Sequence, residues 1–253
     1  MDLGLKGRLC IVTGASRGIG LATARTLAEE GARVLRVARG VEDAHDALSL
    51  DVTAGDAGER LLAACEERSG TPWALVNAAG TSGTRSLDEL PDEVWQQQWE
   101  LHVMGPMRLM RSLAPRMGEA GEGRIVNVCS SSARRPSGTL DPSYSVTKAA
   151  ELSLSRAFAD LFAPRGVLVN AINPGPIEGA LWLEQGGLAD QVAAAKGVSR
   201  DEVLESTRAR VPLGRFGTEG EVAAVIAFLC SERASNVAGA AWAIDGGAVP
   251  TIV

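Results

Sequence analysis

Short apolar runs alternate with segments of helical periodicity along the whole chain. Runs of apolar and β-branched residues that end at glycine or polar positions predict strands, and these lie at 8–14, 33–39, 47–52, 73–80, 123–130, 167–175 and 240–247. Helical spacing of apolar positions predicts helices at 18–31, 56–69, 88–117, 143–163 and 218–232. Strands that alternate with helices form parallel sheets covered on both faces. The pattern therefore predicts an α/β fold, a doubly wound parallel sheet of about seven strands with helices on both faces.

Three segments depart from the regular alternation. The predicted helix over 88–117 is interrupted near Gly105 and Pro106, because both residues disfavour a helix interior. The connection between the second and third strands (39–51) has room for at most a turn or two of helix. A polar, mixed segment covers 176–212, in which Ser199 and Glu202 have the spacing of a helix capping box. No repeat or linker-like stretch divides the chain, so we expect a single domain over 1–253.

Charge and cysteine usage restrict the class of protein. The net charge of −6 argues against a nucleic-acid surface or an anionic membrane as the main partner. The four cysteines are widely separated without a CxxC spacing, which predicts buried reduced thiols and no metal site. The amino-terminal segment lacks the apolar region of a signal peptide, and the longest apolar run, 222–230, is too short to span a bilayer. We expect a soluble, cytoplasmic protein.

A glycine-rich turn, "TGASRGIG" (13–20), joins the first strand to the first helix. Gly14, Gly18 and Gly20 permit a tight turn and a close approach of a pyrophosphate, which the free N–H groups of the helix N-terminus then face. Such a turn by itself is a weak signal, and the alternative is a tight turn without a ligand. Its place at the first strand-to-helix junction favours a dinucleotide site.

The end of the second strand indicates which nicotinamide cofactor is used. An acidic residue about 20 positions after the glycine loop would hold the ribose 2′-hydroxyl of NAD. That position is the neutral Ala38; Arg39 follows it, and Arg17 lies in the loop itself. Two cations without a carboxylate favour a 2′-phosphate, so NADP(H) is preferred over NAD(H). The alternative is that both arginines are merely solvated.

Tyr144, the only tyrosine of the chain, lies four residues before Lys148, on the same face of a predicted helix. A free phenol has a pKa near 10, and a neighbouring ammonium group stabilises the phenolate. A tyrosine in this setting can donate a proton to a carbonyl or accept one from an alcohol. Ser130, Ser131 and Ser132 end the fifth strand and could hold the substrate oxygen. The alternative is a Tyr–Lys pair that only covers a helix surface.

Six motifs together resemble the short-chain dehydrogenase/reductase family, in particular its 3-oxoacyl-reductase-like branch. They are "TGASRGIG", "LDV" around Asp51, "NAAG" at 77–80, "YSVTK", "NPG" at 173–175 and "DGG" at 245–247. They occur in the family's order and span essentially the whole chain. The resemblance implies a Rossmann-like fold and hydride transfer between NADP(H) and a ketone or secondary alcohol. A 3-oxoacyl thioester or another small carbonyl compound is the substrate class that it implies.

The resemblance also implies roles for individual residues. Tyr144 would be the proton donor or acceptor, and Lys148 would hold the hydroxyls of the nicotinamide ribose. The cofactor would contact the glycine loop, the strand ends and the segment after the sixth strand, through Gly14, Ser16, Arg17, Gly18, Ile19, Gly20, Asp51, Val52, Asn77, Ala78, Gly80, Pro174, Gly175 and Ile177.

Two catalytic positions stay open. His102 lies where the family usually has an asparagine that supports a proton-relay water. An imidazole can also hold water and can titrate near neutrality, or His102 can be a packed helix residue that contributes only its backbone. Counting along the fifth strand selects Ser130 as the catalytic serine, whereas counting back from Tyr144 selects Ser131. We prefer Ser130, because hydrogen bonds constrain the register of a strand.

Residues 178–212 are expected to cover the substrate. Leu181, Trp182 and Leu183 make this segment apolar, which favours an apolar substrate or packing on the body or on a neighbouring subunit. The resemblance implies a homotetramer (or homodimer), with Trp95 and Trp99 as interface or core residues.

Two alternative functions would use a bound cofactor differently. A non-catalytic regulator would sense the cofactor without turnover, which the Ser–Tyr–Lys set argues against. A sugar-nucleotide epimerase or dehydratase would use the cofactor transiently, which the GxxxGxG spacing and the short chain argue against.

Overall fold

Seven parallel strands form the central sheet, in the order β3-β2-β1-β4-β5-β6-β9. The computed structural model describes residues 1–68 and 70–250. The strands are β1 (Leu9–Thr13), β2 (Arg33–Ala38), β3 (Ala47–Ser49), β4 (Pro72–Asn77), β5 (Gly123–Val128), β6 (Val167–Pro174) and β9 (Ala241–Ile244). Every predicted strand is present, and the predicted single-domain, Rossmann-like doubly wound α/β fold is confirmed.

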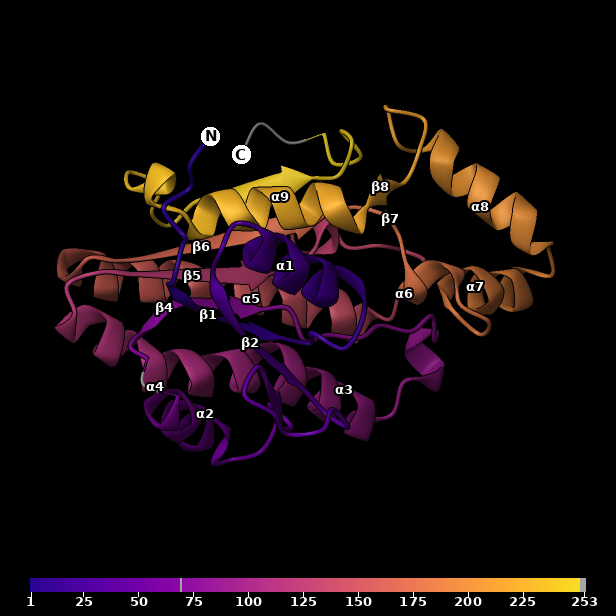
Figure 1. Cartoon of the computed structure of the whole chain (residues 1–253). Coiled ribbons are helices and arrows are strands. Elements are labelled where there is room, and N and C mark those ends of the chain that lie inside the picture. Colours follow the sequence, from indigo (N-terminus) through magenta and orange to yellow (C-terminus); the bar gives the residue numbers. More distant parts are fainter. Residues whose placement is uncertain (69, 251–253) are drawn as a thin grey trace.

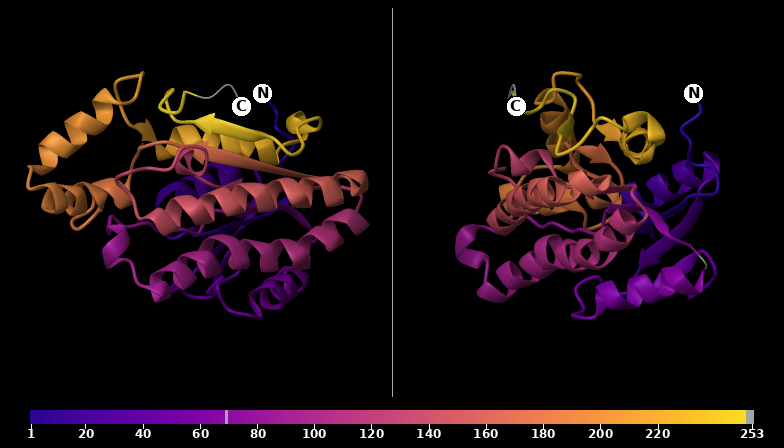
Figure 2. Two further views of the ribbon diagram at one scale, coloured as in Figure 1. Left: turned by 180° about the vertical axis from the view of Figure 1, so that it is seen from behind. Right: turned by 90° about the vertical axis from the view of Figure 1, so that its left-hand side faces the viewer.

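Helices cover the sheet in two layers (Figures 1 and 2). The helices α1 (Gly18–Glu29) and α9 (Glu219–Cys230) pack on one face, and α2 (Ala57–Glu67), α4 (Gly105–Glu119) and α5 (Pro142–Phe162) pack on the other. Successive residues of a strand enter opposite cores: Cys10 and Val12 contact the first layer, and Ile11 contacts the second. Each fully buried aliphatic side chain of this kind stabilises the fold by about 1.5–3 kcal/mol.

The order of the strands reverses beside β1. The chain runs from β1 outward to β2 and β3, and then returns to β4 on the other side of β1. In doubly wound sheets the crevice for a ligand lies at this switch point, outside the carboxyl ends of the strands. The fold therefore places the glycine loop, which follows β1, at the centre of that crevice.

The long helix predicted over 88–117 is divided into several elements. A 3-10 turn, η1 (Leu87–Glu89), precedes α3 (Asp92–Trp99), and a π-helical turn, η2 (Glu100–Met104), leads into α4. The irregularity thus lies just before Gly105 and Pro106. Pro106 lies in the first turn of α4, directly after the π-helical turn, and it has no N–H to donate to the preceding turn.

The short connection between β2 and β3 contains no helix, as its length predicted. Arg68, just after α2, supports it instead. Its Nε donates to the carbonyl of His45 (3.0 Å), and its Nη2 donates to the carbonyl of Ala44 (2.9 Å). The guanidinium group therefore provides hydrogen bonds for backbone carbonyl groups that helical hydrogen bonds would satisfy in a longer connection.

The mixed segment after β6 forms short elements and two helices. They are β7 (Ile177–Glu178), α6 (Ala180–Leu183), α7 (Leu188–Lys196) and α8 (Arg200–Ala209), and β7 pairs with β8 (Gly217–Thr218). The predicted capping box is confirmed at the start of α8, where the Ser199 hydroxyl accepts from the Glu202 N–H (3.2 Å). The helices α7 and α8 project from the body of the molecule in both views (Figures 1 and 2).

All four cysteines are buried and free, as predicted. Burial raises the pKa of Cys65 and of Cys230 to about 12, so both stay protonated thiols at neutral pH. Within 1–68 and 70–250, no cluster of three histidine, cysteine or acidic side chains could hold a metal ion. The same residues include no helix that is long and apolar enough to cross a membrane.

Candidate active site

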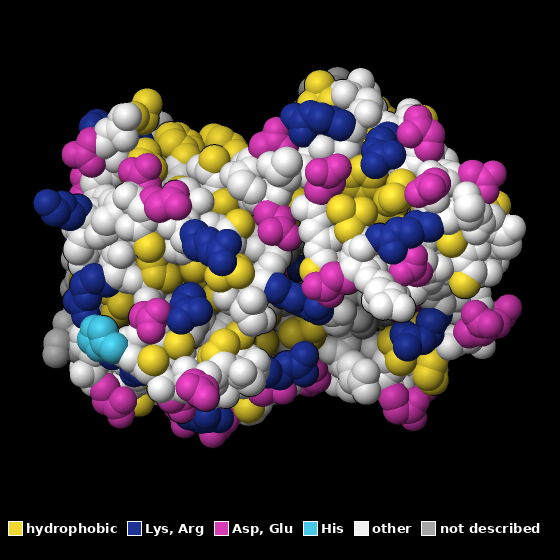
Figure 3. Space-filling model, turned by 45° about the vertical axis from the view of Figure 1, so that its right-hand side comes forward, with side chains coloured by type: hydrophobic (Ala, Val, Ile, Leu, Met, Phe, Trp, Pro, Cys, Tyr) yellow, Lys and Arg dark blue, Asp and Glu magenta, His cyan; other side chains and the backbone are white. Residues whose placement is uncertain are grey.

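A cavity of about 1560 Å³ opens at the carboxyl ends of the strands. Figure 3 shows the surface hollowed between the body of the molecule and the part that carries α7 and α8, with basic side chains at the rim. The cavity brings together most of the residues proposed from the sequence: Gly14, Ser16, Arg17, Gly18, Ile19, Gly20, Arg39, Asp51, Val52, Ala78, Gly80, Ser130, Ser131, Tyr144, Lys148, Pro174, Gly175 and Ile177.

The glycine loop has the shape of a phosphate cradle. Gly14 and Gly18 adopt positive φ angles of 66° and 63°, which side chains rarely tolerate. A Cβ on Gly14 would lie 2.8 Å from the carbonyl oxygen of Ala78, so the loop and the segment after β4 approach closely. Arg17, the N-cap residue of α1, makes no side-chain cap hydrogen bond, and no acidic residue lies in the first turn. The exposed N–H groups and the helix dipole therefore fit a pyrophosphate.

The end of the cavity that lies beside β2 combines one carboxylate with two cations. Asp51 accepts from the N–H and the hydroxyl of Thr53 (2.9 and 2.7 Å), and the backbone bond is the main cause that lowers the pKa of Asp51. Arg39 also lowers that pKa. Arg17 pairs with Glu184 across the cavity (2.8 Å). Both partners of that pair are exposed, so it contributes little stability and leaves Arg17 available.

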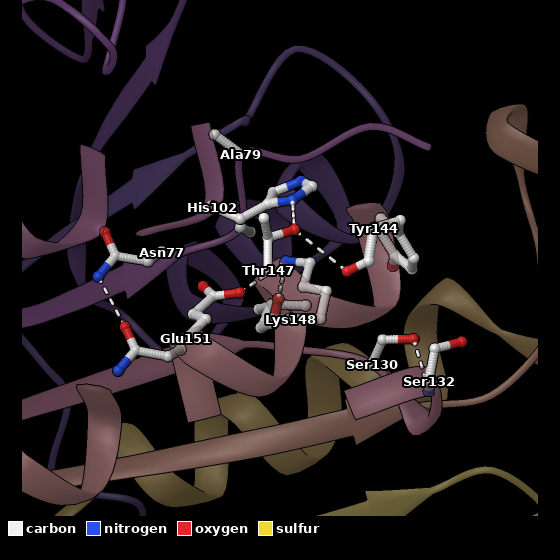
Figure 4. A network of polar contacts seen from close by, with 12 residues as sticks. Asn77, Ala79, His102, Ser130, Ser132, Tyr144, Thr147, Lys148 and Glu151 are labelled. Carbon is white, nitrogen blue, oxygen red and sulfur yellow. Dashed lines mark hydrogen bonds and ion pairs between the residues drawn. The ribbon is translucent and has the colours of Figure 1, made fainter. Parts of the chain in front are cut away.

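Helix α5 carries Tyr144 and Lys148 on its buried face. Tyr144 is 9% exposed and Lys148 is 4% exposed. The Lys148 Nζ donates to the carbonyl of Val128 (2.8 Å) and to Oε2 of Glu151 (2.7 Å), as Figure 4 shows for the carboxylate. Burial is the largest single effect and lowers the pKa of Lys148, but Glu151 and its other neighbours together outweigh it, so the pKa is raised. Lys148 is therefore a charged ammonium group at neutral pH.

The serines lie between β5 and α5. Ser130 ends the strand segment in extended backbone, and its Oγ accepts from the N–H of Ser132 (3.1 Å). Residues 131–133 form a 3-10 turn, η3 (Ser131–Ala133), that packs against α5 (Figure 4). The contact fixes the position of the Ser130 oxygen and leaves its O–H free to donate. Ser131 also lines the cavity, but it makes no comparable bond.

His102 lies beneath the cavity and does not line it. The ring is fully buried; Nε2 accepts from the N–H of Thr81 (3.3 Å), and Nδ1 lies 3.0 Å from Oγ1 of Thr147. Burial and the nearby Lys148 lower the pKa of His102 well below its usual value. The imidazole is therefore neutral with both nitrogens engaged, which favours the second of the two alternatives for His102, a packed helix residue, over a group that titrates near neutrality. It braces η2 against α5 and packs edge-on against Tyr144.

Asn77 also differs from its expected place. Its side chain is buried, and Nδ2 donates to Oδ1 of Asn127 on the neighbouring strand (2.8 Å), so it does not line the cavity. Asn77 ends β4 in register with Asn127. Paired positions on adjacent strands point to the same face, and here that face is the packed core.

Known proteins resemble this chain over nearly its whole length. Residues 14–249 match the family model described as enoyl-(acyl carrier protein) reductase. The 3-oxoacyl-[acyl-carrier-protein] reductase of Vibrio cholerae is 33% identical (97% of this chain, 98% of the relative). The cis-4-hydroxycyclohexanecarboxylate dehydrogenase of Sinomonas cyclohexanicum is 38% identical (95% and 96%). The crystal structure of L-sorbose reductase from Gluconobacter frateurii, complexed with NADPH and L-sorbose, is 35% identical, covers 100% of both chains and has a TM-score of 0.91.

This chain belongs to the short-chain dehydrogenase/reductase family. It is an NAD(P)-dependent oxidoreductase that acts on CH–OH or C=O groups, and it is similar to the 3-oxoacyl reductases. The predicted family and class of enzyme are thereby confirmed.

The sequence pattern did not reveal several residues of this short-chain dehydrogenase/reductase site. Glu151 contacts Lys148. The sequence could have indicated this contact, because opposite charges at i, i+3 on a helix lie close together. Arg210 lines the cavity near α8, and Val249 lines it from the carboxyl-terminal segment. No local pattern could have indicated Arg210 or Val249, because both reach the cavity only through the tertiary fold.

Proposed function

We propose that the protein reduces a small ketone to a secondary alcohol, or oxidises the alcohol, with NADP(H) and with Tyr144 as the proton donor or acceptor. The observation that carries this proposal is the placement of Tyr144 and Lys148 on the buried face of α5, in the same cavity as the glycine loop. A phenol beside a buried ammonium group can exchange a proton with a substrate oxygen at neutral pH.

Each residue has a distinct task in this proposal. When bound, the nicotinamide supplies or accepts the hydride. Ser130 donates its free O–H to the substrate oxygen and holds that oxygen near Tyr144. Lys148 stabilises the phenolate and uses its remaining N–H for the ribose hydroxyls of the cofactor. Pro174, Gly175 and Ile177, at and after the end of β6, form the wall against which the nicotinamide would pack.

Arg39 and Arg17 support a preference for NADP(H), because their positive charges suit the 2′-phosphate of that cofactor. Both line the cavity next to β1 and β2, and Ala38 offers no carboxylate to a ribose 2′-hydroxyl. The bound NADPH of L-sorbose reductase is consistent with this preference.

Replacing Arg39 with alanine should lower kcat/KM for NADPH by about 10- to 100-fold, the value of a charge-assisted hydrogen bond, and leave kcat/KM for NADH unchanged. Steady-state kinetics with both cofactors measure this difference. Arg36→Ala is the matched control, because Arg36 lies on β2, three residues before Arg39, but pairs with Asp46 (3.0 Å) outside the cavity. An equal loss with both cofactors would contradict a role in phosphate recognition.

The substrate end of the cavity combines apolar and basic groups. Leu181, Trp182 and Leu188 line it from α6 and α7, and Arg135 and Arg210 add positive charge. We therefore propose a ketone with an apolar body and an anionic or polar tail, for which 3-oxoacyl thioesters are the first choice. Trp182 packs edge-on against Phe216, so one tryptophan both lines the cavity and anchors α6.

The experiment that tests this function is NADPH and NADH oxidation against a panel of ketones. The panel includes an acetoacetyl thioester, a cyclic oxo acid and a ketose, and the matching alcohols are tested in the reverse direction. Faster turnover with NADH throughout would overturn the cofactor proposal. Cofactor binding without turnover of any ketone or alcohol would overturn the enzymatic proposal.

Association into a homotetramer is also proposed. Large apolar side chains are exposed on α3 and α5, namely Trp99 (40%), Val146 (50%) and Leu161 (66%), and Trp242 of β9 is 36% exposed. Association would bury these side chains, because apolar surface that is contiguous marks sites of protein–protein contact. Light scattering should give the mass of a tetramer, and a monomer at micromolar concentration would contradict this proposal.

A further inference from the structure

A buried carboxylate lies in direct contact with Lys148, and the proposed function does not use it. Glu151 is 1% exposed and lies one turn after Lys148 on α5. Its Oε2 is 2.7 Å from the Lys148 Nζ (Figure 4). A buried ion pair is expensive to desolvate and does not by itself stabilise a fold, so its presence beside a catalytic lysine requires another explanation.

Two other titratable groups beside this pair, His102 and Cys129, are neutral at neutral pH. Tyr144 and Glu151 act on Lys148 from α5, His102 from η2, and Cys129 from the segment after β5. Burial raises the pKa of the Cys129 thiol, and burial together with Lys148 lowers the pKa of His102. Burial raises the pKa of Glu151 to about 6, so its carboxyl group is mostly ionised at pH 7 and is the counter-ion of Lys148.

We propose that Glu151 is a positioning residue for Lys148, whose carboxylate holds the ammonium group and cancels part of the positive charge that Tyr144 experiences. The proposal rests on the proposed role of Tyr144 in proton transfer. An ammonium group has three N–H donors, and Val128 and Glu151 accept two of them. The third remains for the cavity, so the carboxylate fixes both the direction of Nζ and the net charge next to the phenol.

Removing only the negative charge separates this role from simple packing. In Glu151→Gln the side-chain oxygen can still accept from Nζ, but Lys148 becomes a buried charge without a counter-ion. The Tyr144 phenolate, which borders the open cavity, then becomes the nearest group that can supply the counter-charge. The phenolate of Tyr144 should therefore form at lower pH in this variant.

The chain allows a direct measurement, because Tyr144 is its only tyrosine. The ultraviolet absorbance of tyrosinate, followed against pH in the protein without cofactor, reports this residue alone. We expect the midpoint to fall by about one pH unit in Glu151→Gln, which is about a tenfold change in the ionisation constant. Asp160→Asn is the matched control, because Asp160 is an exposed carboxylate on the same helix that pairs with Arg156.

A midpoint in Glu151→Gln that is unchanged or higher than that of the wild type would overturn the inference. Glu151→Asp keeps the negative charge but moves the carboxylate away from Lys148 by one methylene. We expect its tyrosinate midpoint to fall as well, by less than in Glu151→Gln. It is the variant to measure if Glu151→Gln does not fold, and an unshifted midpoint there would equally overturn the inference.

Activity measurements distinguish this inference from the proposed function. The acidic limb of kcat/KM for alcohol oxidation, where Tyr144 becomes protonated and can no longer accept a proton, should move with the tyrosinate midpoint in Glu151→Gln. If Tyr144→Phe retained full turnover, the proposed function would fail, whereas the titration would still report the effect of Glu151. If Tyr144→Phe were inactive and Glu151→Gln titrated like the wild type, only the inference would fail.

Discussion

Replacement of Tyr144 by phenylalanine should lower kcat by about 10²–10⁴-fold, the range that a positioned general acid–base contributes. The change removes one hydroxyl from a ring that packs edge-on against His102, with centroids 5.5 Å apart. A phenylalanine ring preserves that contact, so the fold and the cavity should be retained. Turnover of the best ketone with NADPH measures the loss.

Binding provides the control for this variant. The affinity for NADPH, measured by nucleotide fluorescence, should stay within about threefold of the wild type, because Lys148 and the glycine loop are unchanged. A variant that binds NADPH normally and keeps more than a tenth of the wild-type kcat would show that another group transfers the proton.

Replacement of Gly20 by alanine should abolish tight cofactor binding. A Cβ on Gly20 would lie 2.4 Å from the carbonyl oxygen of Gly14, and Gly20 is buried in the first turn of α1. The start of α1 must therefore move away from the loop that would hold the pyrophosphate. We expect the Kd for NADPH to rise by at least about 100-fold, and stability to fall by about 1–3 kcal/mol, the usual cost of overpacking.

Gly55→Ala is the matched control for this loop variant. Gly55 lies in the turn before α2, and nothing lies within 4 Å of a Cβ built on it. The same substitution there should change stability by less than about 0.5 kcal/mol and leave NADPH affinity unaltered. If Gly20→Ala bound NADPH as tightly as Gly55→Ala does, the glycine loop would not be the phosphate site.

The sheet was predictable because each strand is bounded by glycine or polar residues and each helix has an apolar face. Ile11 and Val12 enter the cores on opposite faces of the sheet. Because β1 is buried on both faces, its sequence is a continuous apolar run, which is typical of strands in parallel sheets. The start of α8 was predictable from Ser199 and Glu202, because a capping box is a local interaction. Local signals of this kind do not depend on distant parts of the chain.

The parts of the site that could not be predicted depend on contacts between distant segments. The neutral state of His102 results from its burial and from the nearby Lys148, which the fold brings together from η2 and α5. Asn77 turns into the core because its neighbour in the sheet is Asn127, 50 residues away in sequence. Spacing along the chain places a residue near a site, but only packing decides which way its side chain points.

The two edges of the sheet differ in how readily they could accept another strand. The edge strand β3 has three residues, and the guanidinium of Arg68 binds backbone carbonyls of Ala44, His45 and Ala47 beside it. Short edge strands with occupied backbone groups resist unwanted pairing with other chains. At the opposite edge, β9 exposes Trp242. Ordered association and aggregation would therefore both begin at the β9 side, and substitutions there should affect solubility more than substitutions near β3.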